Sequence, residues 1–203
     1  MGKLVVCYIQ AFDCEKTIEA AMESVHRQTY NNWLCFVLSN GNRNLPESPN
    51  YSFDIIKKTA SLDRRFIVLN KEYNYIDMYI PMLYHLANHF PDSYICSLDA
   101  DDEYKPDFFE RAVELADREK LDIVACGTEI VLKKRAGSRK ETLLNRRELT
   151  DDLIIRGEDF TKKFSTYNVC IDIHDTINRM RRAQANRRLQ PAHDAPRPHF
   201  YDS

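Results

Sequence analysis

The sequence predicts an α/β protein with a mostly parallel sheet and helices on both faces. Short apolar runs of the kind that form buried strands alternate, in the first half of the chain, with segments whose apolar residues recur at helical spacing. Strands that alternate with helices favour parallel pairing, because each helix carries the chain back across the sheet. At 203 residues the chain is long enough for one domain with a substantial core.

The first two strands and the helix between them are predicted within residues 4–38. Residues 4–9 form an apolar run, which is typical of a buried strand. A helix is expected at 14–26, where apolar residues recur at helical spacing (Ile18, Ala21, Met22 and Val25). Asp13 stands where an N-cap is expected. The second strand is predicted at 33–38, before a turn-rich segment.

The next repeat continues the alternation. Residues 51–59 are expected to form a short helix and 66–69 the third strand. Residues 76–88 have a helical apolar face despite Pro81, and 93–98 form the fourth predicted strand. A helix from Pro106 to about residue 119 follows, because proline suits the first helical position and acids suit the first turn.

The remainder of the chain is less regular. A strand is predicted at 123–126, with a continuation at 129–132, then a basic hairpin or loop at 133–147 and a helix at 158–164. We expect residues 1–171 to form one domain, with 1–130 as its nucleotide-binding half. Residues 172–203 are rich in arginine and lack lysine and apolar periodicity, which predicts an irregular tail foreign to the fold. A basic arm for nucleic acid is the alternative, although aromatic interleaving is missing.

Bulk composition excludes several classes of protein. The net charge of −2 gives no general attraction to nucleic acid, and no apolar stretch approaches the roughly 20 residues that span a bilayer. The six cysteines show no metal-ligand spacing, so we interpret them as reduced core residues of a cytoplasmic protein. Because the first strand begins almost at residue 1, no signal peptide is expected.

The most informative segment is an acidic cluster after the fourth predicted strand. Asp99, Asp101 and Asp102 fall within four positions, where their charges repel unless a cation or water separates them. Carboxylate oxygens suit Mg²⁺ or Mn²⁺, and the carboxyl end of a strand is where α/β sheets bind phosphate-bearing ligands. The cluster predicts a metal-dependent site for a nucleotide or a phosphorylated substrate. A solvated turn is the structural alternative.

Three segments then form a combined pattern. Residues 5–15 make an opening strand and turn, and residues 21–30 include Ser24-Val25-His26-Arg27-Gln28-Thr29-Tyr30. The third segment is Ser97-Leu98-Asp99-Ala100-Asp101-Asp102 with Pro106-Asp107 after it. In this order and spacing they resemble family 2 glycosyltransferases with the GT-A fold and its DxD motif, over roughly residues 4–130. The resemblance implies a metal-dependent enzyme that transfers sugar from a nucleoside-diphosphate sugar.

The resemblance also implies roles for individual residues. Asp101 matches the direct ligand of Mn²⁺ or Mg²⁺, and Asp99 a residue near the ribose or a metal-bound water. The residues expected to contact the donor nucleotide are Ala11, Phe12, Asp13, Ser39, Asn40, Arg65, Asp99 and Ala100. Ser39-Asn40 replaces the family's Asp-Asp, so neutral groups would read the base, with a UDP-sugar as the expected donor. For Arg65 a surface salt bridge is the alternative to a donor contact.

The acceptor side is less defined. An inverting member needs an Asp or Glu base, for which Glu158 and Asp159 are weak candidates because they stand close to the acidic cluster and also suit a helix start. The resemblance implies a glycan or lipid-linked acceptor, as in bacterial surface polysaccharide synthesis, and work near the inner face of the membrane. Two alternatives remain: a nucleotide-sugar-binding module, or a fragment that lacks the acceptor half. An Asp-x-Asp phosphohydrolase fits poorly, because its pair follows the first strand.

Overall fold

The fold was analysed in a computed structural model that describes residues 2–40, 51–71, 79–126, 130–132, 141–143 and 176–179. Its helices are α1 (Ile18–His26), α2 (Tyr51–Ala60), α3 (Tyr79–His89) and α4 (Phe108–Glu119). Its strands are β1 (Val5–Ala11), β2 (Trp33–Asn40), β3 (Phe66–Lys71), β4 (Tyr94–Asp99), β5 (Ile123–Ala125), β6 (Ile130–Leu132), β7 (Glu141–Leu143) and β8 (Thr176–Arg179). Each strand and helix predicted between residues 4 and 126 is present, with shifted ends.

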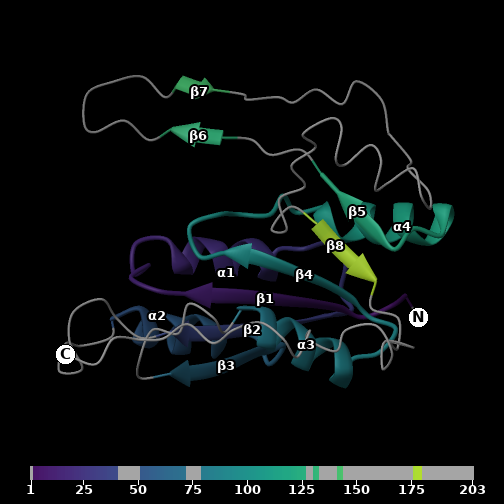
Figure 1. The fold of residues 1–203 in the computed structure, drawn as a ribbon. Helices are drawn as coiled ribbons and strands as arrows, with labels where there is room; N and C mark the ends of the chain where they lie inside the picture. Colours follow the sequence, from purple (N-terminus) through teal and green to yellow (C-terminus); the bar gives the residue numbers. More distant parts are fainter. Residues whose placement is uncertain are drawn as a thin grey trace, which may run out of the picture.

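The central sheet has the strand order β3-β2-β1-β4-β8-β5 (Figure 1). The pairs β3–β2, β2–β1 and β1–β4 are parallel, and β8 runs antiparallel to both of its neighbours. The strand order reverses between β1 and β4, so the carboxyl ends of these two strands form the topological switch point, where α/β sheets bind ligands. A separate two-stranded ladder joins β6 and β7.

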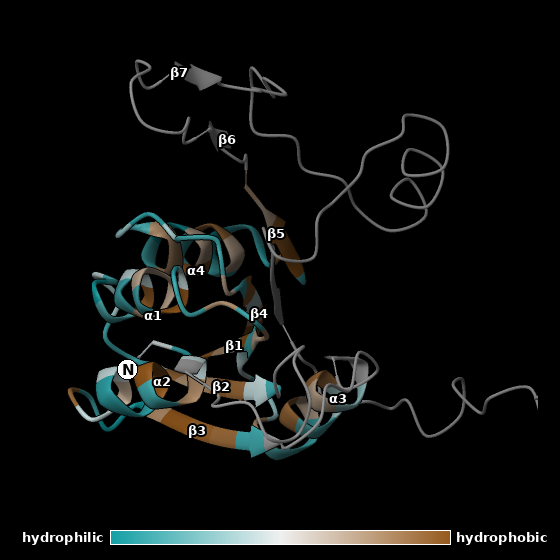
Figure 2. Cartoon of the chain, turned by 90° about the vertical axis from the view of Figure 1, so that its left-hand side faces the viewer, coloured by the Kyte–Doolittle hydropathy of each residue, from teal (hydrophilic) through white to brown (hydrophobic). Residues whose placement is uncertain are grey.

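Helices cover both faces of the sheet, as the sequence predicts. Alternate residues of β1 point to opposite faces: Val5 and Cys7 pack among α1, α2 and α4, whereas Val6 and Tyr8 pack against α3. Figure 2 shows the same arrangement, with apolar strands between α3 on one side and the other three helices on the other. Two hydrophobic layers therefore hold β1 from both sides, and this burial fixes the strand ends that form the site.

The cysteine prediction is partly correct. Cys7 is level with Cys35 on β2 and with Cys96 on β4, and all three are buried in the sheet. Burial raises the pKa of the Cys7 and Cys96 thiols well above the ordinary value, so both stay protonated. Cys126, in contrast, is exposed and follows the last residue of β5, Ala125.

Two predicted helix starts are corrected. Asp13 does not cap α1: it adopts a positive φ of 48°, and an extra turn separates it from the helix, whose N-cap is Thr17. Pro106 lies in a turn before α4, and Asp107 is the N-cap of that helix. In both cases a tight turn lies between the strand-end segment and the helix, so each helix begins later than the apolar spacing alone indicates.

The tail prediction is wrong for four residues. Thr176–Arg179 form β8, which pairs with Tyr94–Cys96 of β4 on one side and with Ile123–Ala125 of β5 on the other. A strand inside the sheet is part of the fold and not foreign to it. The domain boundary after residue 171 stays a prediction, and the predicted helix at 158–164 lies outside the described residues. Of the hairpin or loop predicted at 133–147, Glu141–Leu143 form β7, which pairs antiparallel with β6, and the remaining residues lie outside the described ranges.

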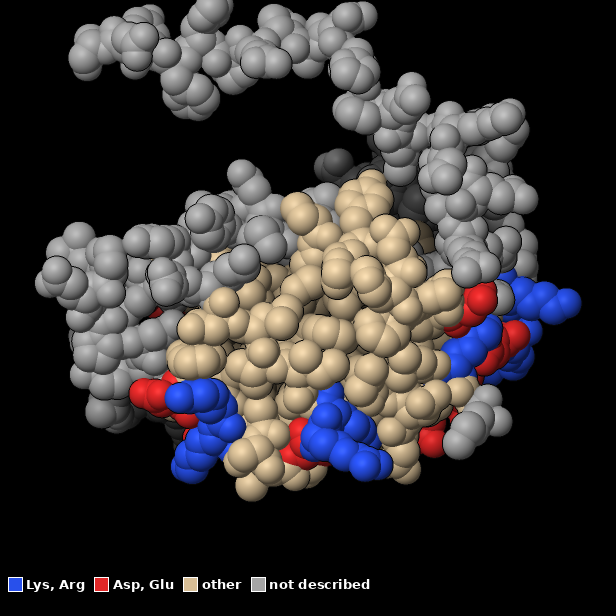
Figure 3. Space-filling model, turned by 90° about the horizontal axis from the view of Figure 1, so that it is seen from below, with Lys and Arg blue, Asp and Glu red and all other residues tan. Residues whose placement is uncertain are grey.

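The surface of the described part mixes both signs of charge. Figure 3 looks onto the molecule from below, where lysine and arginine side chains lie beside aspartate and glutamate side chains, with uncharged areas between them. On α2, the Nζ of Lys57 lies 3.3 Å from the Oδ1 of Asp54. Within the described ranges, no helix has both the length and the apolar character needed to cross a bilayer.

Candidate functional site

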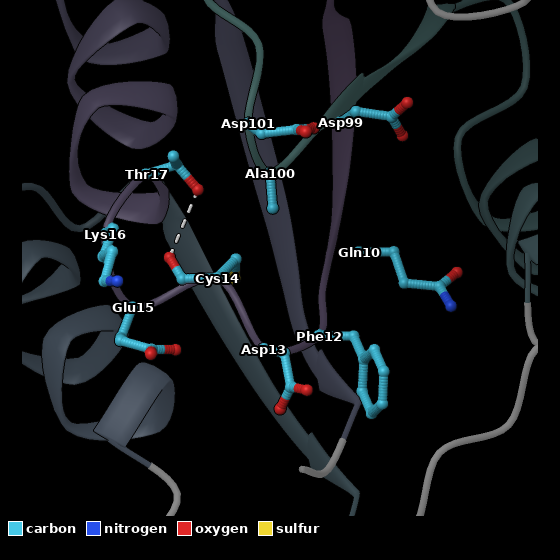
Figure 4. Close-up of a pocket in the computed structure, with 10 residues that line it drawn as sticks. All are labelled: Gln10, Phe12, Asp13, Cys14, Glu15, Lys16, Thr17, Asp99, Ala100 and Asp101. Carbon is cyan, nitrogen blue, oxygen red and sulfur yellow. Dashed lines mark hydrogen bonds between the residues drawn. The ribbon is translucent and has the colours of Figure 1, made fainter. Parts of the chain in front are cut away.

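A cleft opens where β1 and β4 end side by side, with Gln10 level with Asp99. It has a volume of about 630 Å³. One wall is the turn from β1 to α1, and the other is the segment that leaves β4 (Figure 4). The described residues that line it are Gln10, Phe12, Asp13, Cys14, Glu15, Lys16, Thr17, Asp99, Ala100 and Asp101. The cleft thus lies at the switch point of the sheet, where a nucleotide site is expected.

The turn between β1 and α1 is held by its own backbone. The carbonyl of Cys14 accepts hydrogen bonds from the N–H of Thr17 at 3.0 Å and of Ile18 at 2.9 Å, and from the Thr17 hydroxyl at 3.3 Å. The Cys14 N–H donates to the hydroxyl of Ser52 on α2 at 3.2 Å. Asp13 takes the left-handed conformation that aspartate tolerates better than most residues. The wall is therefore a fixed turn with an exposed carboxylate at its tip.

The opposite wall is the segment from Asp99 to residue 104, called the acidic loop below. The N–H of Asp102 donates to the carbonyl of Asp99 at 3.1 Å, which makes a tight turn directly after β4. Asp101, Asp102 and Glu103 are exposed, whereas Tyr104 is buried and donates its hydroxyl to the carbonyl of Ser97 at 2.5 Å. The acidic loop thus presents carboxylates to solvent and is anchored at both ends.

The side chains that line the cleft carry more negative than positive charge. They include four carboxylates (Asp13, Glu15, Asp99 and Asp101) and one ammonium group, that of Lys16. In Figure 4 the carboxylate of Asp99 points away from that of Asp101, on the side of Gln10. A multiply charged anion entering this cleft would be repelled unless a cation entered with it.

The donor set fits one kind of metal site. Within the described ranges, no three His, Cys, Asp or Glu side chains converge as a metal site built from protein alone would require. Mg²⁺ and similar ions, however, are often held by one or two carboxylates together with substrate phosphates and water. Asp101, exposed in the cleft wall, suits that arrangement. The residues therefore fit an ion shared with a diphosphate.

The structure brings most of the predicted site residues together. Phe12, Asp13, Asp99, Ala100 and Asp101 all line the cleft. Three further predicted residues do not line the cleft and lie buried at the ends of β1 and β2: Ala11, Ser39 and Asn40. Ala11 is level with Ser39, and both are buried, so these positions support the cleft from behind instead of forming its surface.

Arg65 does not reach the cleft, which corrects its predicted role as a donor contact. It precedes β3, at the edge of the sheet where the parallel strands begin, and the cleft lies where they end. Its guanidinium binds Asp63, with Nη2 2.6 Å from Oδ2, and lies 3.8 Å from the ring centroid of Trp33. These contacts match the alternative prediction for Arg65, which is a salt bridge.

The candidates for a catalytic base cannot be placed. Glu158 and Asp159 lie outside the described residues. Cys170, the sixth cysteine, which is not a candidate base, also lies outside them. The geometry of the acceptor side is therefore not part of the described site, and the two candidates stay predictions.

Sequence reasoning missed half of the cleft lining. Gln10, Glu15, Lys16 and Thr17 line the cleft without being predicted to do so. Cys14 belongs to the buried core, as the sequence predicts, and also lines the cleft, which it does not predict. The available signal was the polar run of residues 13–17 directly after a buried strand, because such a run must turn at the strand end. Burial raises the pKa of the Cys14 thiol to about 11, so it is a neutral wall group.

A doubly covered, mostly parallel sheet with a polar cleft at its switch point defines a nucleotide-binding α/β protein. The chain belongs to glycosyl transferase family 2, whose family model matches residues 5–188. A curated relative, an uncharacterised glycosyltransferase of Haemophilus influenzae, is 30% identical over 137 residues, which are 66% of this chain. The aligned part spans only 39% of that relative.

Solved structures share the fold at low identity. Residues 1–349 of TarS from S. aureus superpose with a TM-score of 0.52 at 14% identity, covering 66% of this chain and 38% of that one. The mannosyltransferase PcManGT of Pyrobaculum calidifontis, in complex with GDP-Man and Mn²⁺, gives 0.50 at 14% identity, covering 62% and 36%. Together with the parallel sheet between helices, these likenesses confirm the predicted GT-A fold.

Proposed function

We propose that the cleft binds a nucleoside-diphosphate sugar together with Mn²⁺ or Mg²⁺, and that the protein transfers the sugar to an acceptor. Membership of glycosyl transferase family 2 supports the reaction class. The observation that carries the proposal is the position of Asp101, exposed in the cleft wall at the end of β4 and opposite the turn that follows β1.

The charge of the cleft supports metal dependence. Four carboxylates and one ammonium group line it, so a free nucleoside diphosphate meets a surface of its own sign. Asp101 would hold a divalent ion there, and the ion's charge would offset that repulsion. When bound, such an ion would supply stabilisation of the negative charge that grows on the departing diphosphate.

The side chains around the ion have distinct proposed roles. Asp101 is the direct ligand, while Asp99 faces the ribose or a metal-bound water, consistent with its carboxylate pointing away from that of Asp101. Phe12 and Asp13 line the base and ribose end, and Ala100 allows close approach of the backbone. Ala11, Ser39 and Asn40 shape the pocket from behind.

For the donor we propose a UDP-sugar. TarS of the same fold has been solved in complex with UDP and with UDP-GlcNAc, whereas PcManGT holds GDP-Man, so the fold alone serves more than one base. The Asp-Asp pair that the family resemblance leads one to expect is replaced by buried Ser39 and Asn40. Base choice is therefore tested by titrating UDP and GDP side by side.

The acceptor side of the proposal rests on the family resemblance. We propose a glycan or lipid-linked acceptor in the synthesis of a bacterial surface polysaccharide, with the protein working at the inner face of the membrane and Glu158 or Asp159 as candidate bases. The aligned part of the chain spans 39% of the length of the curated relative described above, so acceptor and base are proposed for the whole protein.

Calorimetric titration tests the donor site. Wild-type protein is titrated with UDP in Mn²⁺ and again in EDTA, and we expect binding to be at least tenfold tighter with the metal. Asp101→Asn keeps the shape of the side chain and removes the charge, so it should abolish that difference. Glu114→Gln, on the exposed side of α4, removes the same charge away from the cleft and should preserve it. Equal UDP binding with and without metal in the wild type refutes the site.

Product analysis separates transfer from binding alone. If the chain is a nucleotide-sugar-binding module, it binds UDP with Mn²⁺ but releases no UDP from UDP-sugars over hours. A transferase releases UDP slowly by hydrolysis and faster with a suitable acceptor. Asp101→Asn should lower that release by at least a hundredfold, because the leaving diphosphate loses the ion that stabilises it.

A further inference from the structure

Two buried side chains, Ser24 on α1 and Gln28 just after that helix, reach across to the far end of the acidic loop. Ser24 is 1% exposed and Gln28 is 5% exposed. The Ser24 Oγ accepts the N–H of Tyr104 at 3.0 Å, and its own hydroxyl donates to the carbonyl of Ala21 at 2.7 Å. The Nε2 of Gln28 donates to the carbonyl of Lys105 at 2.8 Å. The loop backbone is thus held by side chains that are more than 70 residues away in sequence.

Gln28 also holds the start of α4. Its Oε1 accepts the N–H of Phe109 at 2.9 Å, and this N–H belongs to the first turn, where helix donors lack intrahelical partners. The amide of Gln28 therefore joins three groups: its nitrogen donates to the carbonyl of Lys105, directly after the acidic loop, and to that of Ser24 at 3.1 Å, and its oxygen caps the helix that follows. The planar amide thus links the end of the acidic loop to the start of α4.

The loop needs such restraint because of its charge. Asp99, Asp101, Asp102 and Glu103 fall within five positions, and mutual repulsion favours conformations in which the chain opens. Apolar packing secures Ala100, which is buried in the core, and Tyr104, whose ring stacks on Phe108 at a centroid distance of 4.4 Å. The backbone from Tyr104 to the start of α4 is held by the hydrogen bonds to Ser24 and Gln28.

We propose that Ser24 and Gln28 are positioning residues of the metal site: they hold the acidic loop so that Asp101 faces the cleft. The inference rests on the proposed metal-dependent donor site. Neither side chain lines the cleft, so they act through the loop backbone and not by touching the donor. Loss of either one lets the loop relax away from the cleft while the apolar core of the sheet stays folded.

The test compares metal-dependent binding in variants of matched stability. Ser24→Ala removes the acceptor of the Tyr104 N–H, and Gln28→Met keeps the side-chain length without hydrogen bonds. The matched control is Ser93→Ala, because Ser93 is also buried and donates its hydroxyl to the carbonyl three residues earlier, that of Phe90, at 2.7 Å. UDP affinity is measured with Mn²⁺ and with EDTA, and Mn²⁺ affinity by electron paramagnetic resonance in the presence of UDP.

We expect Ser24→Ala and Gln28→Met to weaken Mn²⁺ binding about tenfold and to leave UDP binding in EDTA unchanged. Ser93→Ala should lower the melting temperature to a similar degree without altering Mn²⁺ affinity. The inference is overturned if the wild type binds UDP in a metal-dependent way and the Ser24→Ala and Gln28→Met variants both retain its Mn²⁺ affinity. If the wild type itself shows no metal dependence, the donor-site proposal fails and this inference fails with it.

Discussion

Two nitrogens of the Arg65 guanidinium donate hydrogen bonds to the carboxylate of Asp63. Nε lies 3.0 Å from each carboxylate oxygen and Nη2 lies 2.6 Å from Oδ2. The same carboxylate receives the Arg65 N–H at 2.9 Å and lies 3.1 Å from Nδ1 of His26. The pair joins the start of β3 to the end of α1, on the side of the sheet away from the cleft.

This ion pair predicts a dependence of stability on acid. The hydrogen bonds from Arg65 lower the pKa of Asp63 to about 2. Because the folded pKa is below the unfolded value of about 3.9, the stabilisation is fully present above pH 4 and is lost as the pH falls toward 2. Asp63→Asn should cost about 2 kcal/mol at pH 7, and its stability should change less than that of the wild type between pH 4 and pH 2. Urea unfolding at each pH measures this, and parallel pH curves would contradict it.

Tyr104→Phe should destabilise the fold by about 1 kcal/mol. The substitution removes the hydroxyl that donates to the Ser97 carbonyl but keeps the ring that stacks on Phe108. A loss of that size lowers the melting temperature by about 2–4 °C in a chain of this length. Tyr84→Phe, at an exposed position on α3, is the control and should leave it unchanged. Equal melting temperatures for both variants would show that the Tyr104 hydroxyl contributes nothing.

Cys14 should react slowly although it lines the cleft. Burial raises the pKa of its thiol to about 11, so at pH 8 only about one molecule in a thousand carries the reactive thiolate. The exposed Cys126 provides the internal comparison. Timed alkylation with iodoacetamide, followed by peptide mass spectrometry, should show Cys126 modified at least a hundredfold faster. Similar rates at the two cysteines would mean that the Cys14 thiol is neither buried nor protonated as described.

Glu15→Gln should strengthen metal-free binding of UDP. Glu15 contributes one of the four carboxylates of the cleft, and its removal reduces repulsion of the diphosphate by up to about 1 kcal/mol. We expect a two- to threefold gain in EDTA at low salt, and about no gain at high salt, where screening suppresses the effect. Glu19→Gln on α1 removes an acid that does not line the cleft and should change nothing. A salt-independent gain would contradict an electrostatic cause.

The parallel core of the fold was predictable because its signals are local. Every strand from β1 to β4 is a short apolar run, and the helices between them keep apolar spacing. β8 was not predictable in this way. It has only four residues, and its pairing with β4 and β5 depends on contacts that no local pattern encodes. The sequence separation between β8 and its two partner strands hid this pairing.

The site was predictable where chemistry and strand ends coincide. Asp99 and Asp101 combine both signals, and both line the cleft. The predicted donor contact of Arg65 is wrong because this residue precedes β3, and parallel strands begin and end at opposite edges of a sheet. Ser24 and Gln28 belong to the segment of residues 24–30 that resembles the family. Their hydrogen-bond partners lie around residue 105, so only the folded chain shows which backbone groups they bind.

The insertion of β8 between β4 and β5 has a consequence for biosynthesis. As the chain leaves the ribosome, β4 can pair with β1 at once, but its other side stays open until residues 176–179 emerge. An open strand is a template for pairing with another nascent chain. Fragments that end before residue 176 should therefore associate through β4 at high concentration, whereas chains that include β8 close their own sheet.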